Sequence, residues 1–508
     1  MEMIGFDNDK YIELQSRYIL EQVESYDKLY LEFGGKLIDD YHAMRVLPGY
    51  DPRAKVKLLH ELREDTEIII SIYAGDIEHN KIRGDYGITY EEDVFRLIDE
   101  FRAYDLDVNS VVITRYNDEP AVKVFMHKLE QRNIKVYAQK YTEGYPFDVD
   151  TIVSEKGYGQ NQYIETEKSI VVLTAPGPNS GKLGVCLSQL YHETNKGVRA
   201  GYAKFETFPV WNLPLKHPVN IAYEAATAEI LDVNMIDPYH LEAYNKSAVN
   251  YNRDVEAFPL VRRIMAKIYG EEAPYKSPTD MGVNQVGYSI IDDEVVREAA
   301  NQEIIRRYFR LSCDYKKGII EASVAQRGKL LMDEMQLSEE DRVVVQPARD
   351  YAEELYNREP ELYTGSVVPR STAMQLPNGE IVTGKGSSAM SSISACLLNA
   401  IKQMSGIADA IHLLSPVILE PVHYLKDDIL HQKRHDLNAL EILLTLSISA
   451  ATNPLAAEAM RKLEDLRGCQ AHTTVIPNKA DEEVCQQLGI DITADPVFSG
   501  DSIYYSGI

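Results

Sequence analysis

The sequence predicts an α/β fold whose N-terminal part is a doubly wound, P-loop-like parallel sheet. Short β-branched runs alternate with amphipathic helical patterns over residues 1–217, which is the order that a buried parallel sheet requires. Residues 170–183 (IVVLTAPGPNSGKL) then lead an apolar strand directly into a glycine–lysine turn and a helical pattern. We expect this α/β domain to be followed by a helical domain over 218–363 and a smaller α+β domain over 364–508.

The strand and helix signals of the first domain follow one another regularly. Strands are predicted at residues 67–74, 110–116, 134–138, 170–174 and 198–205. Helices are predicted at 90–104 and 120–132, and another should follow the turn and end near residue 193. Ligands of such sheets bind at the carboxyl ends of the strands, so polar residues that follow these strands are expected to line a cleft.

The two later domains show different periodicities. Helical spacing dominates the second domain, with helices predicted at 218–230, 254–269, 294–315, 323–335 and 350–356. The third domain begins with a hairpin at 376–383 around an Asn-Gly turn. A helix at 389–404 should follow, with Ser387 or Ser388 as its N-cap. The chain should close with a strand, a helix and a strand at 472–476, 480–488 and 490–493.

The glycine–lysine turn is the main functional signal of the chain. Backbone N–H groups at a strand-to-helix turn converge on an anion, and a lysine at the helix start can reach outer phosphates. The predicted phosphate-binding residues are Pro178, Asn179, Ser180, Gly181 and Lys182. The predicted ligand is ATP or a related nucleotide with Mg²⁺.

The turn departs from the usual P-loop at two positions. Pro176 replaces its first glycine, and Leu183 replaces the Ser or Thr that follows the lysine. The missing hydroxyl removes the usual Mg²⁺ ligand, so the metal would need Ser180, Thr174, a distant carboxylate or the nucleotide alone. An ordinary strand–turn–helix connection is the alternative interpretation.

Residues that follow other strands complete the predicted site. Lys204 and Glu206 end the strand after the turn, and with Lys182 we assign them catalytic roles in positioning and charge stabilisation. A second glycine–lysine–serine turn at 384–388 is a further possible anion site, alternatively a capped helix start. The predicted substrate contacts are Arg83, Asp85, Arg115, Thr279, Asp280, Asn284, Lys385 and Ser387.

Composition restricts the partners and the location. The formal net charge of −26 argues against nucleic acid or an anionic membrane as a partner. No apolar stretch is long enough to span a bilayer, and the first ten residues do not resemble a signal peptide, so we expect a cytoplasmic protein. The five cysteines (Cys186, Cys313, Cys396, Cys469 and Cys485) read as reduced core thiols. Frequent tyrosine and the long helices suggest a homo-oligomer.

Other catalytic arrangements are weaker. His431 and His435 stand four residues apart, with His423 two turns earlier, which is a spacing that can bind zinc in a metal-dependent hydrolase. Gln432 stands where a metalloprotease needs glutamate, so we predict no metal site. The chain also lacks a Gly-x-Ser-x-Gly elbow and a Rossmann glycine fingerprint in the right context, which argues against a serine hydrolase and an NAD dehydrogenase.

Several longer segments resemble one family over nearly the whole chain. They are EFGGKL (32–37), TAPGPNSGK (174–182), AGYAKFETFP (200–209), NYNRD (250–254) and SPTDMGVN (277–284). The chain resembles the bacterial family called domain of unknown function 1846, or UPF 0371. The family turn usually reads Gly-Ser-Gly-Lys-Met, and Asn179, which replaces its first glycine here, tolerates a positive φ.

The resemblance implies no assigned activity. Some members of the family carry an ATP-dependent peptidase label, for which this sequence offers no peptidase residues. The residues instead favour a cytoplasmic enzyme that binds ATP or another phosphorylated small molecule and performs phosphoryl transfer or NTP-dependent ligation on a small metabolite. The alternative is a non-catalytic assembly or regulatory protein in which the turn binds an anion for stability.

Overall fold

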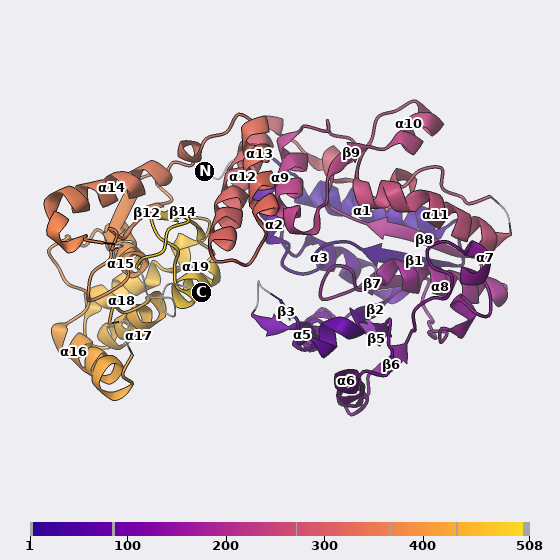
Figure 1. The fold of residues 1–508 in the computed structure, drawn as a ribbon, viewed down its shortest axis with the longest axis horizontal. Helices are drawn as coiled ribbons and strands as arrows, with labels where there is room; N and C mark the ends of the chain where they lie inside the picture. The colour runs from indigo at the N-terminus through magenta and orange to yellow at the C-terminus, as the bar shows by residue number, and fades with distance from the viewer. Residues whose placement is uncertain (1–3, 84–86, 271, 366, 433–434, 501–508) are drawn as a thin grey trace. The chain divides into compact units, whose positions relative to one another are not determined.

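The chain forms two compact units in a computed structural model that describes residues 4–83, 87–270, 272–365, 367–432 and 435–500. The first unit contains residues 1–300 and the second contains residues 301–508 (Figure 1). Residues 218–300, which the sequence assigned to a separate helical domain, group with the α/β unit because they supply one strand of its sheet.

The centre of the first unit is a parallel sheet of seven strands in the order β11-β8-β1-β7-β2-β5-β6. This arrangement confirms the predicted α/β class. The strands are β1 (Lys28–Phe33), β2 (Thr66–Tyr73), β5 (Asp107–Thr114), β6 (Lys135–Ala138), β7 (Ile170–Thr174), β8 (Ala200–Phe205) and β11 (Gly282–Val283). Two small antiparallel ribbons join β3 (Ile82–Arg83) to β4 (Ile88–Thr89) and β9 (Asn234–Ile236) to β10 (Val249–Tyr251).

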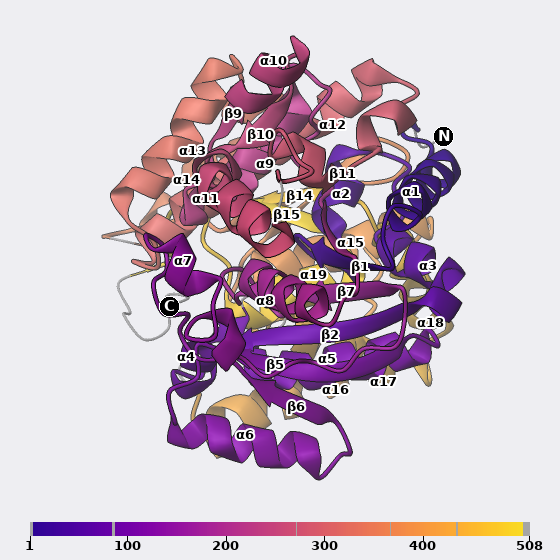
Figure 2. The same ribbon diagram turned by 90° about the vertical axis from the view of Figure 1, so that its right-hand side faces the viewer.

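Helices α7 (Val149–Ile152), α8 (Lys182–Asn195) and α11 (Asn252–Tyr269) share one core with the sheet. In Figure 2, α8 lies along β1 and β7, with which it is in contact. Tyr30, Val171 and Leu173 of the sheet pack in this core beside Val185 of α8 and Phe258 of α11. The other helices of the unit are α1 (Asn8–Val23), α2 (Tyr41–Val46), α3 (Ala54–Glu61), α4 (Ala74–Glu78), α5 (Tyr90–Ala103), α6 (Pro120–Glu130), α9 (Pro218–Ala226) and α10 (Pro238–Tyr244).

The strand order reverses between β1 and β7. From β1 the chain continues to β2, which lies beyond β7 in the strand order. From β7 it continues to β8 in the opposite direction, beyond β1. Such a reversal leaves an opening at the carboxyl ends of the two strands, and ligands of open parallel sheets bind there. The glycine–lysine turn follows β7 and therefore lies at this position.

The second unit is helical around a four-stranded sheet in the order β13-β12-β14-β15. Its strands are β12 (Ser371–Gln375), β13 (Ile381–Lys385), β14 (Gln470–Thr473) and β15 (Asp491–Ala494), which confirm the predicted hairpin and the predicted parallel finish. Its helices are α13 (Ala322–Glu334), α14 (Val345–Arg358), α15 (Ser392–Met404), α16 (Pro416–Tyr424), α17 (Ala439–Ala450), α18 (Pro454–Arg461) and α19 (Lys479–Leu488), while α12 (Asp293–Lys316) crosses the unit boundary.

The N-cap predicted for the helix after the hairpin was wrong. Helix α15 begins at Ser392, and the side chain of Ser391 caps it by accepting from the Ser394 backbone N–H. The hydroxyl oxygen of Ser387 instead accepts from the N–H groups of Ala389 and Met390, so it stabilises a turn that precedes the helix. The sequence contains several serines in succession, and spacing alone did not distinguish them.

Candidate functional site

The turn between β7 and α8 has the backbone of an anion-binding loop. Lys182 is the first residue of α8, and Gly181 precedes it with φ 87°. An added Cβ at Gly181 would lie 3.0 Å from Cγ2 of Thr114, so both the backbone angle and the space favour glycine. Asn179 also adopts a left-handed conformation, with φ 59°, which asparagine tolerates better than most residues.

Several backbone N–H groups of this turn have no acceptor within the described residues. Among the residues that the structure describes, none of the N–H groups from Asn179 to Gly184 has a protein acceptor. Val185 is the first residue of the helix to donate, to the Gly181 carbonyl at 3.0 Å. Free N–H groups at a helix start attract anions because they carry partial positive charge and add to the helix dipole.

Side chains of the neighbouring strands β2 and β5 hold the turn by hydrogen bonds. The Thr114 hydroxyl donates to the carbonyl of Ser180 at 2.8 Å. The Ser71 hydroxyl lies 3.5 Å from Oγ of Ser180 and 3.4 Å from the carbonyl of Thr174. Ser180 is therefore buried with its hydroxyl toward β2, and its side chain holds the turn in place.

Lys182 and Lys204 lie close together but differ in their partners. The Lys204 side chain is 11% exposed, and its ammonium contacts Asp254 at 2.6 Å and Glu206 at 3.0 Å. Burial disfavours its charge, but these carboxylates outweigh burial and raise its pKa. The Lys182 ammonium makes no hydrogen bond or close ion pair within the described chain, and burial lowers its pKa despite the attraction of Glu32 and Glu206.

Two carboxylates lie beside these lysines. Glu32 of β1 is the register neighbour of Lys204 in β8 and accepts a hydrogen bond from the Tyr202 hydroxyl at 2.8 Å. Burial raises the pKa of Glu206 to about 7, with Asp254 acting in the same direction and Lys204 opposing. An added Cβ at Gly34 would lie 2.7 Å from the Glu206 carboxylate, so this glycine lets the end of β1 approach Glu206. The structure thus brings together the three predicted catalytic residues Lys182, Lys204 and Glu206.

Several residues of this site were missed from the sequence. Tyr251 donates to Glu206 at 2.9 Å and contacts Lys204, and Asp254 is the closest carboxylate to Lys204. Arg253 donates to Asp232 at 2.8 Å and lies 3.5 Å from the Asn179 side chain of the turn. These residues come from β10 and α11, far from the turn in sequence. Their segment NYNRD carried family resemblance but no recognisable spacing for chemistry.

Comparison with known proteins agrees with the resemblance of the sequence. Family models described as "Domain of unknown function DUF1846, N-terminal" and "Domain of unknown function DUF1846, C-terminal" match residues 4–336 and 340–504. The chain belongs to the DUF1846 family. A UPF0371 protein of Clostridium botulinum strain Alaska E43 is 60% identical over 503 residues, and one of Clostridium tetani is 61% identical over 503 residues. Each alignment covers 99% of both chains.

The predicted substrate residues of this DUF1846 chain occupy different surroundings. Arg115 lies beside the turn: it donates to the Asn179 carbonyl, and its guanidinium carbon is 3.5 Å from the centre of the Tyr73 ring. Arg83, on β3, forms an ion pair with Asp93 of α5. Asp85 lies outside the described residues.

The segment Thr279 to Asn284 is tied into the fold. Thr279 donates its hydroxyl to Asp237 at 2.6 Å, and Asp280 accepts from the Tyr244 hydroxyl at 2.9 Å. The Asn284 side-chain amide donates to the carbonyls of Thr207 and Pro209. These bonds tie the three predicted substrate residues to neighbouring segments of the fold, and none of the bonds reaches the glycine–lysine turn within the described residues.

The second glycine–lysine turn belongs to the other unit. Lys385 ends β13 as an exposed residue, and α15 starts only at Ser392. The carbonyl of Ser387 accepts from Arg370 at 3.1 Å. This turn therefore does not place its lysine at a helix start, which is the feature that the first turn uses.

The remaining sequence signals do not form a metal site in the described part of the chain. No group of three or more His, Cys, Asp or Glu residues there is arranged to hold a metal ion. His435 lies 3.0 Å from Asp427, but it is two-thirds exposed. The five cysteines are free and buried, as predicted. Every helix in the described residues is too short or too polar to cross a bilayer.

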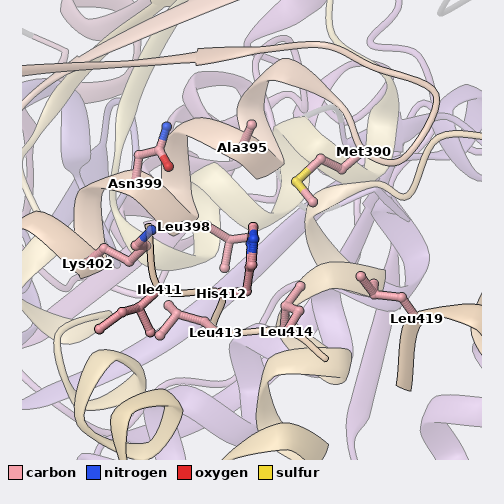
Figure 3. A pocket seen from close by; sticks show the side chains of 10 residues that line it. All are labelled: Met390, Ala395, Leu398, Asn399, Lys402, Ile411, His412, Leu413, Leu414 and Leu419. Carbon is pink, nitrogen blue, oxygen red and sulfur yellow. The ribbon is translucent and has the colours of Figure 1, made fainter. Parts of the chain in front are cut away.

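The second unit also contains a cavity of about 200 Å³ between α15 and the segment before α16. Its walls are mainly apolar, with Leu398, Leu413 and Leu414 among them, and Lys402 and Met390 lie at opposite sides (Figure 3). The Lys402 ammonium already donates to the carbonyl of Asp409 at 2.6 Å. The charged group of this cavity thus already has an acceptor, whereas the N–H groups of the turn before α8 have none within the described residues.

Proposed function

We propose that the turn before α8 binds the phosphates of ATP or a related nucleotide, and that the protein performs phosphoryl transfer or NTP-dependent ligation on a small metabolite. The observation that carries the proposal is the run of N–H groups from Asn179 to Gly184 without protein acceptors, beside a lysine without a close ion pair in the described chain. Both features match the electrostatic requirements of bound phosphate.

The residues present suit Mg²⁺ through a carboxylate. Ser180 has its hydroxyl directed at Ser71, and Leu183 offers none, so the hydroxyl ligand of the usual loop is missing. Glu32 is the next-to-last residue of β1, the strand beside β7, and accepts one hydrogen bond through one of its two oxygens, which makes it the residue that would hold the ion. Bound Mg²⁺ would supply charge neutralisation at the phosphates.

Within this proposal each charged residue has a separate role. Lys182 would neutralise the outer phosphates, and Lys204 would hold Glu206 and Asp254 in position through its two ion pairs. Glu206 would accept a proton from the attacking group, since a base is most effective when its pKa is near the working pH. The Tyr251 hydroxyl would orient that carboxylate.

Calorimetric titration tests the nucleotide site. ATP, ADP and inorganic phosphate are titrated with and without Mg²⁺ into the wild type and into Lys182→Ala. Lys196→Ala is the matched control, because Lys196 is the exposed C-cap of the same helix, α8. We expect Lys182→Ala to weaken ATP binding by about 10- to 150-fold and Lys196→Ala to retain it, with both proteins folded by circular dichroism. Equal affinity in all three proteins would overturn the proposal.

One observation favours a non-catalytic alternative. Lys204, assigned a catalytic role from the sequence, already has two carboxylate partners and a tyrosine contact, so its charge is balanced within the protein. A regulatory or assembly protein that binds an anion for stability would show the same arrangement. Nucleotide binding without turnover across a metabolite screen, together with a raised melting temperature, would support this alternative over the enzyme.

We also propose a cytoplasmic homo-oligomer. Leu440, Leu444 and Ile448 are about half exposed and follow one another at intervals of four on α17, so they form an apolar row. A chain with a net charge of −26 repels its copies, and an uncharged row is a surface on which two copies can meet. Light scattering of the wild type and of Leu444→Glu tests this, and a monomeric wild type would exclude it.

A further inference from the structure

The carboxyl edge of the sheet differs on the two sides of the glycine–lysine turn. On the β1 and β8 side lie charged groups, among them Glu32, Lys204 and Glu206. On the β2, β5 and β6 side the residues at the same edge are Tyr73, Arg115 and Tyr141, which end or follow those three strands. The first side therefore offers charged groups of both signs, whereas the second offers flat groups, namely two aromatic rings and one guanidinium plane.

Contacts join these three flat groups to one another and to the turn. The Arg115 guanidinium lies 3.5 Å from the centre of the Tyr73 ring and donates to the Asn179 carbonyl. Tyr141 is near enough to hydrogen-bond the Tyr73 hydroxyl, and this bond raises the pKa of Tyr73. The Tyr141 side chain is 65% exposed, so its ring has a free surface.

We infer that this surface, formed by Tyr73, Arg115 and Tyr141, stacks the nucleobase of a bound nucleotide. The inference rests on the proposed phosphate site and adds the orientation of the ligand. Aromatic rings and guanidinium planes bind the faces of bases by stacking, and stacking tolerates any base. With its base over β5 and β6 and its first phosphates on the turn, the nucleotide directs its terminal phosphate toward Lys182 and the charged group at β1 and β8.

Comparison of ATP with inorganic tripolyphosphate tests the inference, since tripolyphosphate has the phosphates without the base. Both are titrated by calorimetry into the wild type, Tyr141→Ala, Tyr141→Phe and Phe147→Ala. Phe147 is the control, because it is the more exposed ring, at 89%, in the same connection, and within the described residues it makes no ring contact or hydrogen bond with the three flat groups.

We expect the wild type to bind ATP more tightly than tripolyphosphate. Tyr141→Ala should weaken ATP binding about 5- to 150-fold, the range that removal of one stacked aromatic ring produces, and leave tripolyphosphate binding unchanged. Tyr141→Phe should retain ATP binding because it keeps the ring, and Phe147→Ala should bind like the wild type. Equal binding of both ligands, or an unchanged Tyr141→Ala, would overturn the stacking role while leaving the phosphate site intact. Failure of both ligands to bind would overturn the phosphate site itself.

Discussion

The two glycine–lysine turns of this protein are similar in sequence but differ in structure. In the first, at 177–182, the lysine is the first residue of α8 and the preceding N–H groups have no acceptors in the described chain. In the second, at 384–388, the glycine and lysine end β13, and six residues lie between Lys385 and the start of α15. The comparison shows that a glycine–lysine pair in the sequence does not by itself place the lysine at a helix start, which is the feature that the proposed phosphate site requires.

The largest difference between the turns is expected in ligand binding. Lys182→Ala should weaken ATP binding by about 10- to 150-fold, because hydrogen bonds to a charged group contribute about 1.5–3 kcal/mol. Lys385→Ala should leave binding unchanged, since Lys385 is an exposed strand residue. Calorimetric titration of the two variants in parallel measures both effects. A loss of binding in Lys385→Ala instead would reverse the comparison.

Replacing a glycine with alanine should change the stability of the protein in opposite directions in the two regions. An added Cβ at Gly384 would lie 2.2 Å from the backbone nitrogen of Cys396, so Gly384→Ala should lower the free energy of unfolding by about 1–3 kcal/mol. Gly184→Ala in α8 meets no atom within 4 Å and should raise it by about 0.5–1 kcal/mol. Urea denaturation followed by circular dichroism measures both changes. A neutral Gly384→Ala would mean that β13 and α15 pack less closely than described.

The carboxylate near the first turn should make stability depend on pH. The pKa of Glu206 is about 7 in the folded protein and 4.5 as the unperturbed value, so the native state binds more protons than the unfolded state between these limits. The free energy of unfolding should therefore fall as pH rises from 4.5 to 7, by up to about 1.4 kcal/mol per pH unit from this group. Glu206→Gln should reduce that slope in urea titrations at several pH values. An identical slope in the variant would exclude Glu206 as its source.

The smallest effect is expected at the caps that follow the second turn. Ser391→Ala should lower the free energy of unfolding by about 1 kcal/mol, because it removes the acceptor for the Ser394 N–H. Ser388→Ala should have almost no effect, since Ser388 is exposed and precedes the helix by four residues. Thermal unfolding of the two variants shows which of the two serines caps α15. A larger loss in Ser388→Ala would restore the earlier helix start that the sequence predicted.

Elements with a strong hydrophobic pattern could be predicted from the sequence. Strand β1 could not, because charged residues interrupt its pattern. β2, β5 and β7 consist of β-branched runs, so their burial in a parallel sheet is visible in the residues alone. β1 contains Lys28 and Glu32, which read as solvent-exposed. Both are buried, because Lys28 pairs with Glu193 of α8 and Glu32 accepts from Tyr202.

Some residues of the candidate site could likewise be predicted from the sequence, and others could not. The turn and Lys204 with Glu206 lie on consecutive elements, so their proximity follows from the order of β7, α8 and β8. Asp254, Tyr251 and Arg253 reach the site from α11 and the strand before it, about 50 residues later than Lys204. Nothing in local spacing indicates such a contact, because it depends on how α11 packs against α8.

The position of β1 between β7 and β8 also determines when the first unit can fold. Strand β1 is made first, but both of its partners lie at residues 170–205. At about 5–20 residues per second of synthesis, β1 waits roughly 7 to 30 seconds before its first partner leaves the ribosome. The pairing of β1 with β7, beside which the turn lies, thus forms late, because it joins residues more than 130 positions apart in the chain. Ribosomes stalled before and after β8 should therefore carry a protease-sensitive and a protease-resistant N-terminal segment, respectively.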